Sequence, residues 1–128
     1  MLLPPSAIKR ITFRCYPPDR ATIGHPGTAI KVNGRECGVI VENPCWGGNP
    51  TGDNRFAVRL QVGVTQRVPD DPRSWEWVTV KTRFDTEPEA RAYVTRDKLV
   101  AMLESIKDKP YKGGPVAYTG ELWVDDTA

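Results

Sequence analysis

Residues 75–84 read WEWVTVKTRF, with rings at Trp75 and Trp77 and cations at Lys81 and Arg83, each pair separated by one residue. Successive side chains of an extended strand point to opposite faces, so Val78, Val80 and Phe84 are expected to share one face. The opposite face would carry Trp75, Trp77, Thr79, Lys81 and Arg83. Proteins that bind single-stranded nucleic acid combine such groups, because rings stack on bases and cations follow the phosphates. The sequence therefore predicts a nucleic-acid-binding face that contains Trp75, Trp77, Lys81 and Arg83.

Polar side chains of neighbouring strands would extend this face if they point to the same side of the sheet. The candidates are Arg10, Arg14, Tyr16, Arg55, Arg59 and Gln61, and we assign Arg14, Tyr16 and Arg59 to the binding face. In an alternative arrangement, Trp75 and Trp77 cover a second small core, and the cations beyond them form the solvated edge of an ordinary sheet. The sequence leaves both arrangements open.

A long loop is predicted at residues 42–55, ENPCWGGNPTGDNR, because Gly, Pro, Asn and Asp dominate this segment. Loops of such length inside compact domains are often functional. Trp46 is suited to anchor a protein partner, with Asn49 and Asp53 as polar contacts, or to fold back onto the domain. The Gly-Gly pair after it lacks the lysine and the helix of a phosphate-binding loop. We therefore expect a partner-binding loop without a nucleotide site.

Metal-ligating and catalytic side chains are few. Four residues, Cys15, His25, Cys37 and Cys45, have the ligand types of a zinc site. No Cys-x-x-Cys pair is present, so we expect free thiols and no metal. No nucleophile motif accompanies His25, the one histidine of the chain. We therefore expect neither a catalytic residue nor a cofactor, and a small enzyme centred on His25 is only a third hypothesis.

Alternating apolar and polar residues predict the strands that would position these side chains. Residues 11–16 form one strand, and residues 29–32 and 37–41 flank Asn33-Gly34, a strong hairpin signal because both positions must tolerate positive φ. Residues 56–64 alternate as a half-buried strand does. A second long strand would span residues 75–84, and a final strand or hairpin would lie within residues 116–124.

One helical segment is predicted around residues 87–108. It begins with a capping box, in which Thr86 caps the backbone and Glu89 reaches back to it. Ala90, Tyr93 and Val94 lie off the apolar stripe of the later turns, so a break near Thr95 stays open. Lys107 and Lys109 would complement the helix dipole in the last turn, before Pro110 ends the helix.

The composition is typical of one globular domain. The chain has 128 residues, of which 39% are hydrophobic, and this size suffices for one core. Together with the predicted elements, this indicates an α+β domain over residues 1–128 that is mainly antiparallel. It would have five to six strands, with a small barrel as one arrangement, and the helical segment packed on them. No signal peptide or membrane-spanning run is recognised, so we expect a cytoplasmic protein without a membrane partner.

Charge is unevenly distributed along the chain. Residues 1–83 hold twelve Lys/Arg and seven Asp/Glu, a net of +5, whereas residues 84–128 hold six and nine, a net of −3. Eleven of the eighteen cations are Arg, which suits planar contact with phosphate or carboxylate. The net charge of +2 is also compatible with an ordinary surface. Only the basic strand-rich part therefore favours a polyanionic partner.

The segment from Pro26 to Val62 resembles the small β-barrels of the KOW and Tudor type. The resemblance rests on PGTAIKVNGRECGVIVENP and, after a loop, FAVRLQV. These contain a Pro-Gly start, a tight turn, Gly38 leading into an apolar run, and a strand with alternating Val and Leu. It implies binding of nucleic acid or protein tails through loops and one open face. The later helical segment would be an addition to such a barrel.

Two classes of function follow from these observations. The first is a non-enzymatic binding module whose sheet binds nucleic acid, or that is accessory to a nucleic-acid-handling complex. The second is a small protein-binding adaptor or inhibitor, of the compact kind that phages and mobile elements encode, acting through Trp46 and the acidic C-terminal part. Salt dependence distinguishes them, because phosphate contacts lose affinity steeply with salt.

Overall fold

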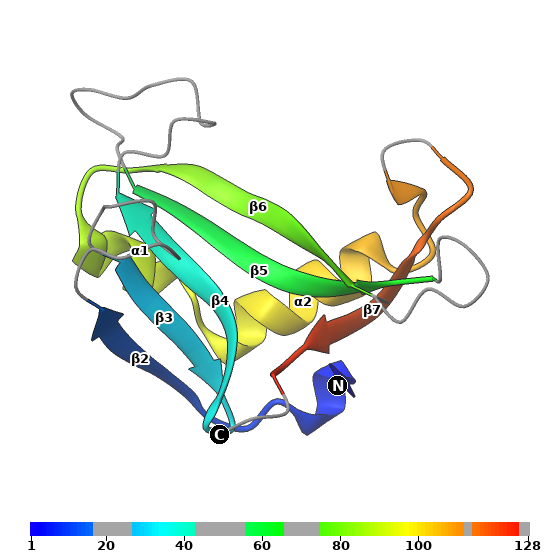
Figure 1. Ribbon diagram of the computed structural model, residues 1–128, viewed down its shortest axis with the longest axis horizontal. Coiled ribbons are helices and arrows are strands. Elements are labelled where there is room, and N and C mark those ends of the chain that lie inside the picture. The colour runs from blue at the N-terminus through cyan, green and yellow to red at the C-terminus, as the bar shows by residue number, and fades with distance from the viewer. Residues whose placement is uncertain (17–26, 43–55, 66–74, 112–113, 126–128) are drawn as a thin grey trace.

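The structure is a computed structural model that describes residues 1–16, 27–42, 56–65, 75–111 and 114–125 (Figure 1). For Tyr16, Glu42 and residues 81–83 it describes the backbone only. The elements are β1 (Leu2–Leu3), the short 3-10 helix η1 (Pro5–Ala7), β2 (Ile11–Tyr16), β3 (Gly27–Val32), β4 (Arg35–Glu42), β5 (Phe56–Val64), β6 (Trp75–Phe84), α1 (Glu87–Tyr93), α2 (Arg96–Ile106) and β7 (Tyr118–Trp123). The predicted α+β class, mainly antiparallel, is confirmed.

The seven strands form one antiparallel sheet that is organised around β5. Leu60 pairs with β6 and with β4, and Val62 pairs with β6 and with β7. One edge of β5 therefore carries β6, and the other edge carries first β4 and then β7. Figure 1 shows β4 and β7 diverging from β5. Their far ends meet again, because the Asp125 amide donates to the Glu36 carbonyl at 2.9 Å.

The strand count of five to six was too low. The additional strand is β1, whose two residues pair with the end of β7, Leu2 with Trp123 and Leu3 with Leu122. Two residues cannot show an alternating pattern, so the sequence carried no signal for this strand. The final element is one strand, β7, and the sheet path through the described strands is open, running from β1 to β2.

The β3–β4 hairpin is confirmed, and Asn33 ties it to the preceding chain. Asn33 and Gly34 adopt φ of 54° and 84°, as the two-residue turn requires. Asn33 Oδ1 accepts hydrogen bonds from the amides of Lys9 and Arg10 at 3.0 and 3.1 Å. Its Nδ2 donates to the Ala7 carbonyl at 2.8 Å. One side chain therefore fixes both the turn and the segment between η1 and β2.

The prediction that β5 is half-buried was wrong. Eight of its nine residues are buried and Arg59 is intermediate. An alternating sequence of apolar and polar residues predicts a solvent-exposed face only where no other part of the protein covers that face. Here β5 has strands on both edges, and the residues between its large apolar side chains include the small Ala57 and Gly63, which pack closely. A central strand is consequently enclosed even where its sequence alternates.

The predicted helical segment is divided at Val94-Thr95. Thr86 caps α1 by accepting from the Glu89 amide at 3.3 Å, and Glu89 reaches back to the amide of Asp85 rather than to that of Thr86. Thr95 caps α2 by accepting from the Lys98 amide at 3.3 Å. A second capping threonine therefore causes the break, and it lets α1 and α2 each present an apolar side to the sheet.

The helix also ends earlier than predicted. α2 stops at Ile106, so Lys107 and Lys109 do not lie in its last turn. Asp108 takes a left-handed φ of 67°, which ends the helix before Pro110 is reached.

Both helices cover one face of the sheet and form the core with it. Side chains of the two helices share this core with alternate residues of the central strands: Ile30, Val32, Ile40, Val58, Leu60, Val62, Ala90, Val94, Leu99, Leu103 and Leu122. Phe84 belongs to the same cluster, and Val78 and Val80 pack against it, as the alternation of β6 predicted. The opposite face carries no helix of the described residues. No helix in these ranges is long and apolar enough to span a membrane.

Replacing Asn33 with Gly separates the two roles of this residue. Glycine keeps the left-handed turn but removes three side-chain hydrogen bonds, each of which contributes about 1 kcal/mol net. We expect N33G to lower the free energy of unfolding by about 1–3 kcal/mol in urea denaturation. N33D retains the acceptor oxygen, so its free energy of unfolding should lie between those of N33G and the parent protein. Equal stability of N33G and the parent protein would contradict the role assigned to the side chain.

Candidate functional site

The helix-free face of the sheet brings together residues from five strands. Register pairs connect Arg14, Ala29, Val39, Arg59 and Thr79 in one row across β2, β3, β4, β5 and β6. Paired residues of antiparallel strands point to the same side, so Arg14 and Arg59 share this face. Three strand spacings separate them, about 14 Å. The structure therefore places these two predicted cations on one surface.

Three tryptophans, Trp75, Trp77 and Trp123, lie beside one another on this face and are called the tryptophan cluster below. The ring centroids of Trp75 and Trp77 are 5.8 Å apart and nearly perpendicular, at 84°. Trp75 and Trp123 are stacked, with centroids 6.1 Å apart and 22° between the planes. All three side chains are partly buried. The rings fill the space between one another, so the cluster is a platform rather than a cage around an empty centre.

Gly63 provides the space on which this platform depends. It pairs with Trp75 on β6, and Leu2 of β1 approaches it from the other edge. A Cβ at this position would lie 2.4 Å from Thr119 Oγ1 and 2.6 Å from Leu2 Cδ2. A side chain at Gly63 would therefore have to shift the side chains of Thr119 and of Leu2, the residue that pairs with Trp123.

Arg59 adds a cation to the cluster. Its guanidinium carbon lies 5.2 Å from the ring centroid of Trp77. Burial lowers the pKa of Arg59, and an arginine nevertheless remains charged at neutral pH. A cation held over an indole contributes about 0.5–2 kcal/mol. The predicted pairing of ring and cation thus exists at Arg59 and Trp77.

Gln61 lies between the strands that carry these rings. It pairs with Trp77 on β6, and its neighbour Val62 pairs with Leu122, the residue before Trp123, on β7. Its side chain is 7% exposed. The side-chain oxygen, Oε1, is buried and accepts no hydrogen bond from the described residues. A polar group in this position is unusual, because buried acceptors are nearly always satisfied.

The expected continuation of the ladder through Lys81 and Arg83 does not follow from the structure. Register shifts interrupt the pairing of β5 with β6 on both sides of Val58. Lys81 is thereby paired with Val58, a core residue, whereas Thr79 is paired with Arg59. The pairing of β5 with β6 is regular only from Trp75 to Thr79, so the register does not carry the predicted ladder on to Lys81.

Several predicted residues lie outside what the structure describes. The side chains of Lys81, Arg83 and Tyr16 are among them, and of Tyr16 only its backbone pairing with Gly27 is known. Residues 43–55, which include Trp46, Asn49 and Asp53, lie outside the described ranges altogether. Trp123 was not predicted for the site, because the sequence of β7 does not reveal which strand lies beside it.

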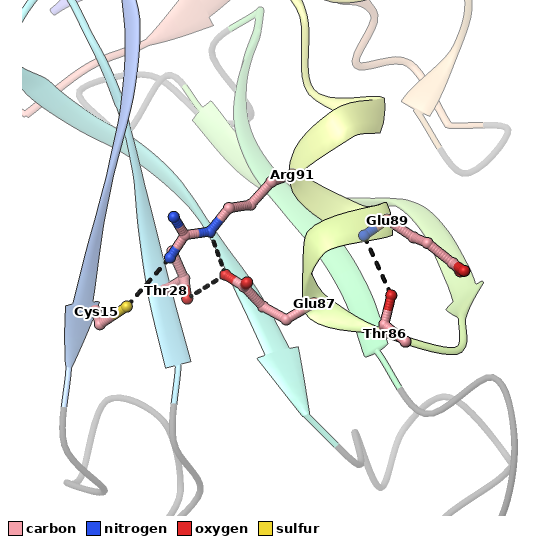
Figure 2. A network of polar contacts seen from close by, with 6 residues as sticks. All are labelled: Cys15, Thr28, Thr86, Glu87, Glu89 and Arg91. Atoms are coloured by element: carbon pink, nitrogen blue, oxygen red, sulfur yellow. Dashed lines mark hydrogen bonds and ion pairs between the residues drawn. The ribbon is translucent and has the colours of Figure 1, made fainter.

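A second polar network fastens α1 to the outer strands on the helix-covered face (Figure 2). Glu87 Oε1 accepts from Thr28 Oγ1 at 2.9 Å and from Arg91 Nε. Arg91 Nη2 in turn lies 3.1 Å from Cys15 Sγ, and its guanidinium carbon lies 5.2 Å from the Phe13 ring centroid. These contacts explain how a seven-residue helix is held in place, and we assign the network a structural role.

The described cysteines offer no metal site. Cys15 is exposed and Cys37 is buried. Among the residues that the structure describes, no three His, Cys, Asp or Glu side chains converge. Burial, followed by the charges of Asp125 and Glu36, raises the pKa of the Cys37 thiol from 9.0 to about 12. Cys37 is therefore a neutral core thiol at physiological pH.

Introducing a methyl group at Gly63 tests the packing under the tryptophan cluster. We expect G63A to lower the free energy of unfolding by about 1–3 kcal/mol, because its Cβ has no room, and to change the near-ultraviolet circular dichroism of the rings. G114A is the matched control, since a Cβ there meets, among the described residues, Tyr111 O at 3.6 Å. If G63A and G114A behaved alike, the proposed close packing would be refuted.

Stability at alkaline pH reports on Cys37. The unfolded thiol loses its proton near its ordinary pKa of 9.0, whereas the folded thiol keeps it up to about 12. The unfolded state thus binds fewer protons in this window, and the free energy of unfolding should fall as pH rises from 9.0 to about 12. Denaturant titrations across this range should show a shallower fall for C37A. An identical fall in both proteins would exclude this role for Cys37.

Comparison with known proteins finds no match to this chain. No protein-family model, no curated protein and no solved structure is significantly similar to it. The resemblance of residues 26–62 to KOW and Tudor barrels consequently stays a prediction. The chemistry of the described side chains is what supports a function.

Proposed function

We propose that this domain binds single-stranded nucleic acid on the helix-free face of its sheet. The observation that carries the proposal is the tryptophan cluster with the Arg59 guanidinium over the Trp77 ring. Nonspecific single-strand binders place rings and cations side by side in this manner. Bases would stack on the partly exposed indoles, and the strand would be held by charge.

The positions of the cations support a path for the nucleic-acid strand across the sheet. Arg14 lies on the same face as Arg59, about 14 Å away across the sheet. Arg14 is exposed, and Lys31 lies nearby on the same side as its register partner Thr12. The phosphates of a nucleic acid that crosses the sheet from the tryptophan cluster toward β2 would meet these cations. The basic balance of residues 1–83 favours the same partner.

The alternative function, a protein-binding adaptor or inhibitor, depends on Trp46, Asn49 and Asp53. These residues lie outside the described ranges, and no described contact favours it over the first proposal. A protein interface centred on an apolar anchor would lose little affinity as salt increases, so one titration distinguishes the two classes.

Fluorescence anisotropy with a mixed-sequence single-stranded oligonucleotide at low salt tests the proposal. We expect W77A to weaken binding by about 1–3 kcal/mol, the contribution of one stacked base, and W77F to weaken it less because a ring remains. R14Q should reduce the slope of log affinity against log salt by about 0.7, the value for one phosphate contact on a single strand.

The matched control is K98Q, which removes an exposed cation of α2 near Tyr93 rather than one of the proposed face. We expect it to bind as the parent protein does. No binding at low salt, or equal loss of affinity in K98Q and R14Q, would contradict the assigned face.

A further inference from the structure

Gln61 has a buried side-chain acceptor that none of the described residues satisfies. Its Oε1 atom is buried and accepts no hydrogen bond from the described residues, although the residue itself is 7% exposed. Leaving an acceptor unpaired reduces stability, and an apolar side chain of the same length would avoid this cost. Such a group is explained when a ligand supplies the missing donor.

The position of Gln61 defines which part of a ligand would reach it. Trp77 lies opposite on β6, and Trp123 follows Leu122, which pairs with Val62 on the other edge of β5. A base that stacks on either indole has its ring parallel to that indole and turns its polar edge toward a neighbouring side chain. Access to Oε1 requires one of these partly buried indoles to turn outward.

We propose that Gln61 selects bases that carry an exocyclic amine, with adenine the preferred one. The inference rests on the proposed single-strand binding and adds a preference to it. Adenine offers an amine donor beside a ring-nitrogen acceptor, and glutamine pairs with both through its oxygen and its amide nitrogen. A carbonyl in place of the amine would set two acceptors against each other. Arg59, two residues along the same face, contributes charge for the phosphate.

Two oligonucleotides of equal length test the preference. One contains adenine throughout, and the other contains purine, which lacks the 6-amino group but keeps the stacking surface. We expect the parent protein to bind the adenine strand about 3–10 times more tightly, the effect of one net hydrogen bond. Q61M and Q61L should bind both strands equally, with an affinity near that of the parent protein for the purine strand. Both variants should unfold at an equal or higher temperature than the parent, because an unpaired buried acceptor has been removed.

The outcomes separate this inference from the proposal on which it rests. Equal binding of both strands by the parent protein would overturn the role of Gln61 and leave single-strand binding intact. A preference for adenine that persists in Q61M and Q61L would also overturn it. Absence of binding to either strand would overturn both proposals. Loss of folding in both variants would show that the amide supports the fold, and would equally overturn the inference.

Discussion

The fold of this protein depends on how the two edges of β5 are divided among its three partner strands. A strand has only two edges, and here one of them serves β6 while the other serves β4 and β7 in succession. β4 and β7 must separate where the first pairing ends, and the helices pack against the core that forms beside them. The backbone hydrogen bond between Asp125 and Glu36 joins the two branches again.

The same constraint explains where the aromatic side chains gather. Trp75 and Trp77 come from β6, and Trp123 comes from β7, on opposite edges of β5. The rings of Trp75 and Trp123 stack, and Gly63, which pairs with Trp75, leaves room beside them for the side chains of Leu2 and Thr119. The order of the strands also explains why the polar Gln61 is buried, since β6 and β7, on the two edges of β5, each contribute an indole. Burial of this amide therefore follows from strand order rather than from its own sequence context.

Local signals predicted the parts of the fold that local physics determines. Asn33-Gly34 specified its turn because both residues tolerate positive φ, and the threonine cap at Thr86 specified where the helical segment begins. The extent of β6 was predicted correctly because its residues suit an extended chain. The ring and cation of the site were both identified on this basis, as Trp77 and Arg59.

Features that depend on distant pairing were not predictable from the chain. The burial of β5 requires its three partner strands, and the register shifts beside Val58 depend on how β6 twists along β5. Trp123 belongs to the cluster because β7 lies next to β5, a neighbour more than fifty residues away in sequence. The network of Thr28, Glu87 and Arg91 likewise joins segments whose proximity no spacing indicates.

The irregular pairing of β6 bears on association between copies of the chain. Among the described strands β6 pairs only with β5, so its outer edge presents backbone groups that another extended chain can use. A straight edge of ten residues would be a template for edge-to-edge aggregation. The two register shifts near Val58 bend that edge and break its regular spacing of donors and acceptors. Continuous pairing of a second molecule along the whole edge is thereby disfavoured, and only the regular stretch from Trp75 to Thr79 is left as a short template.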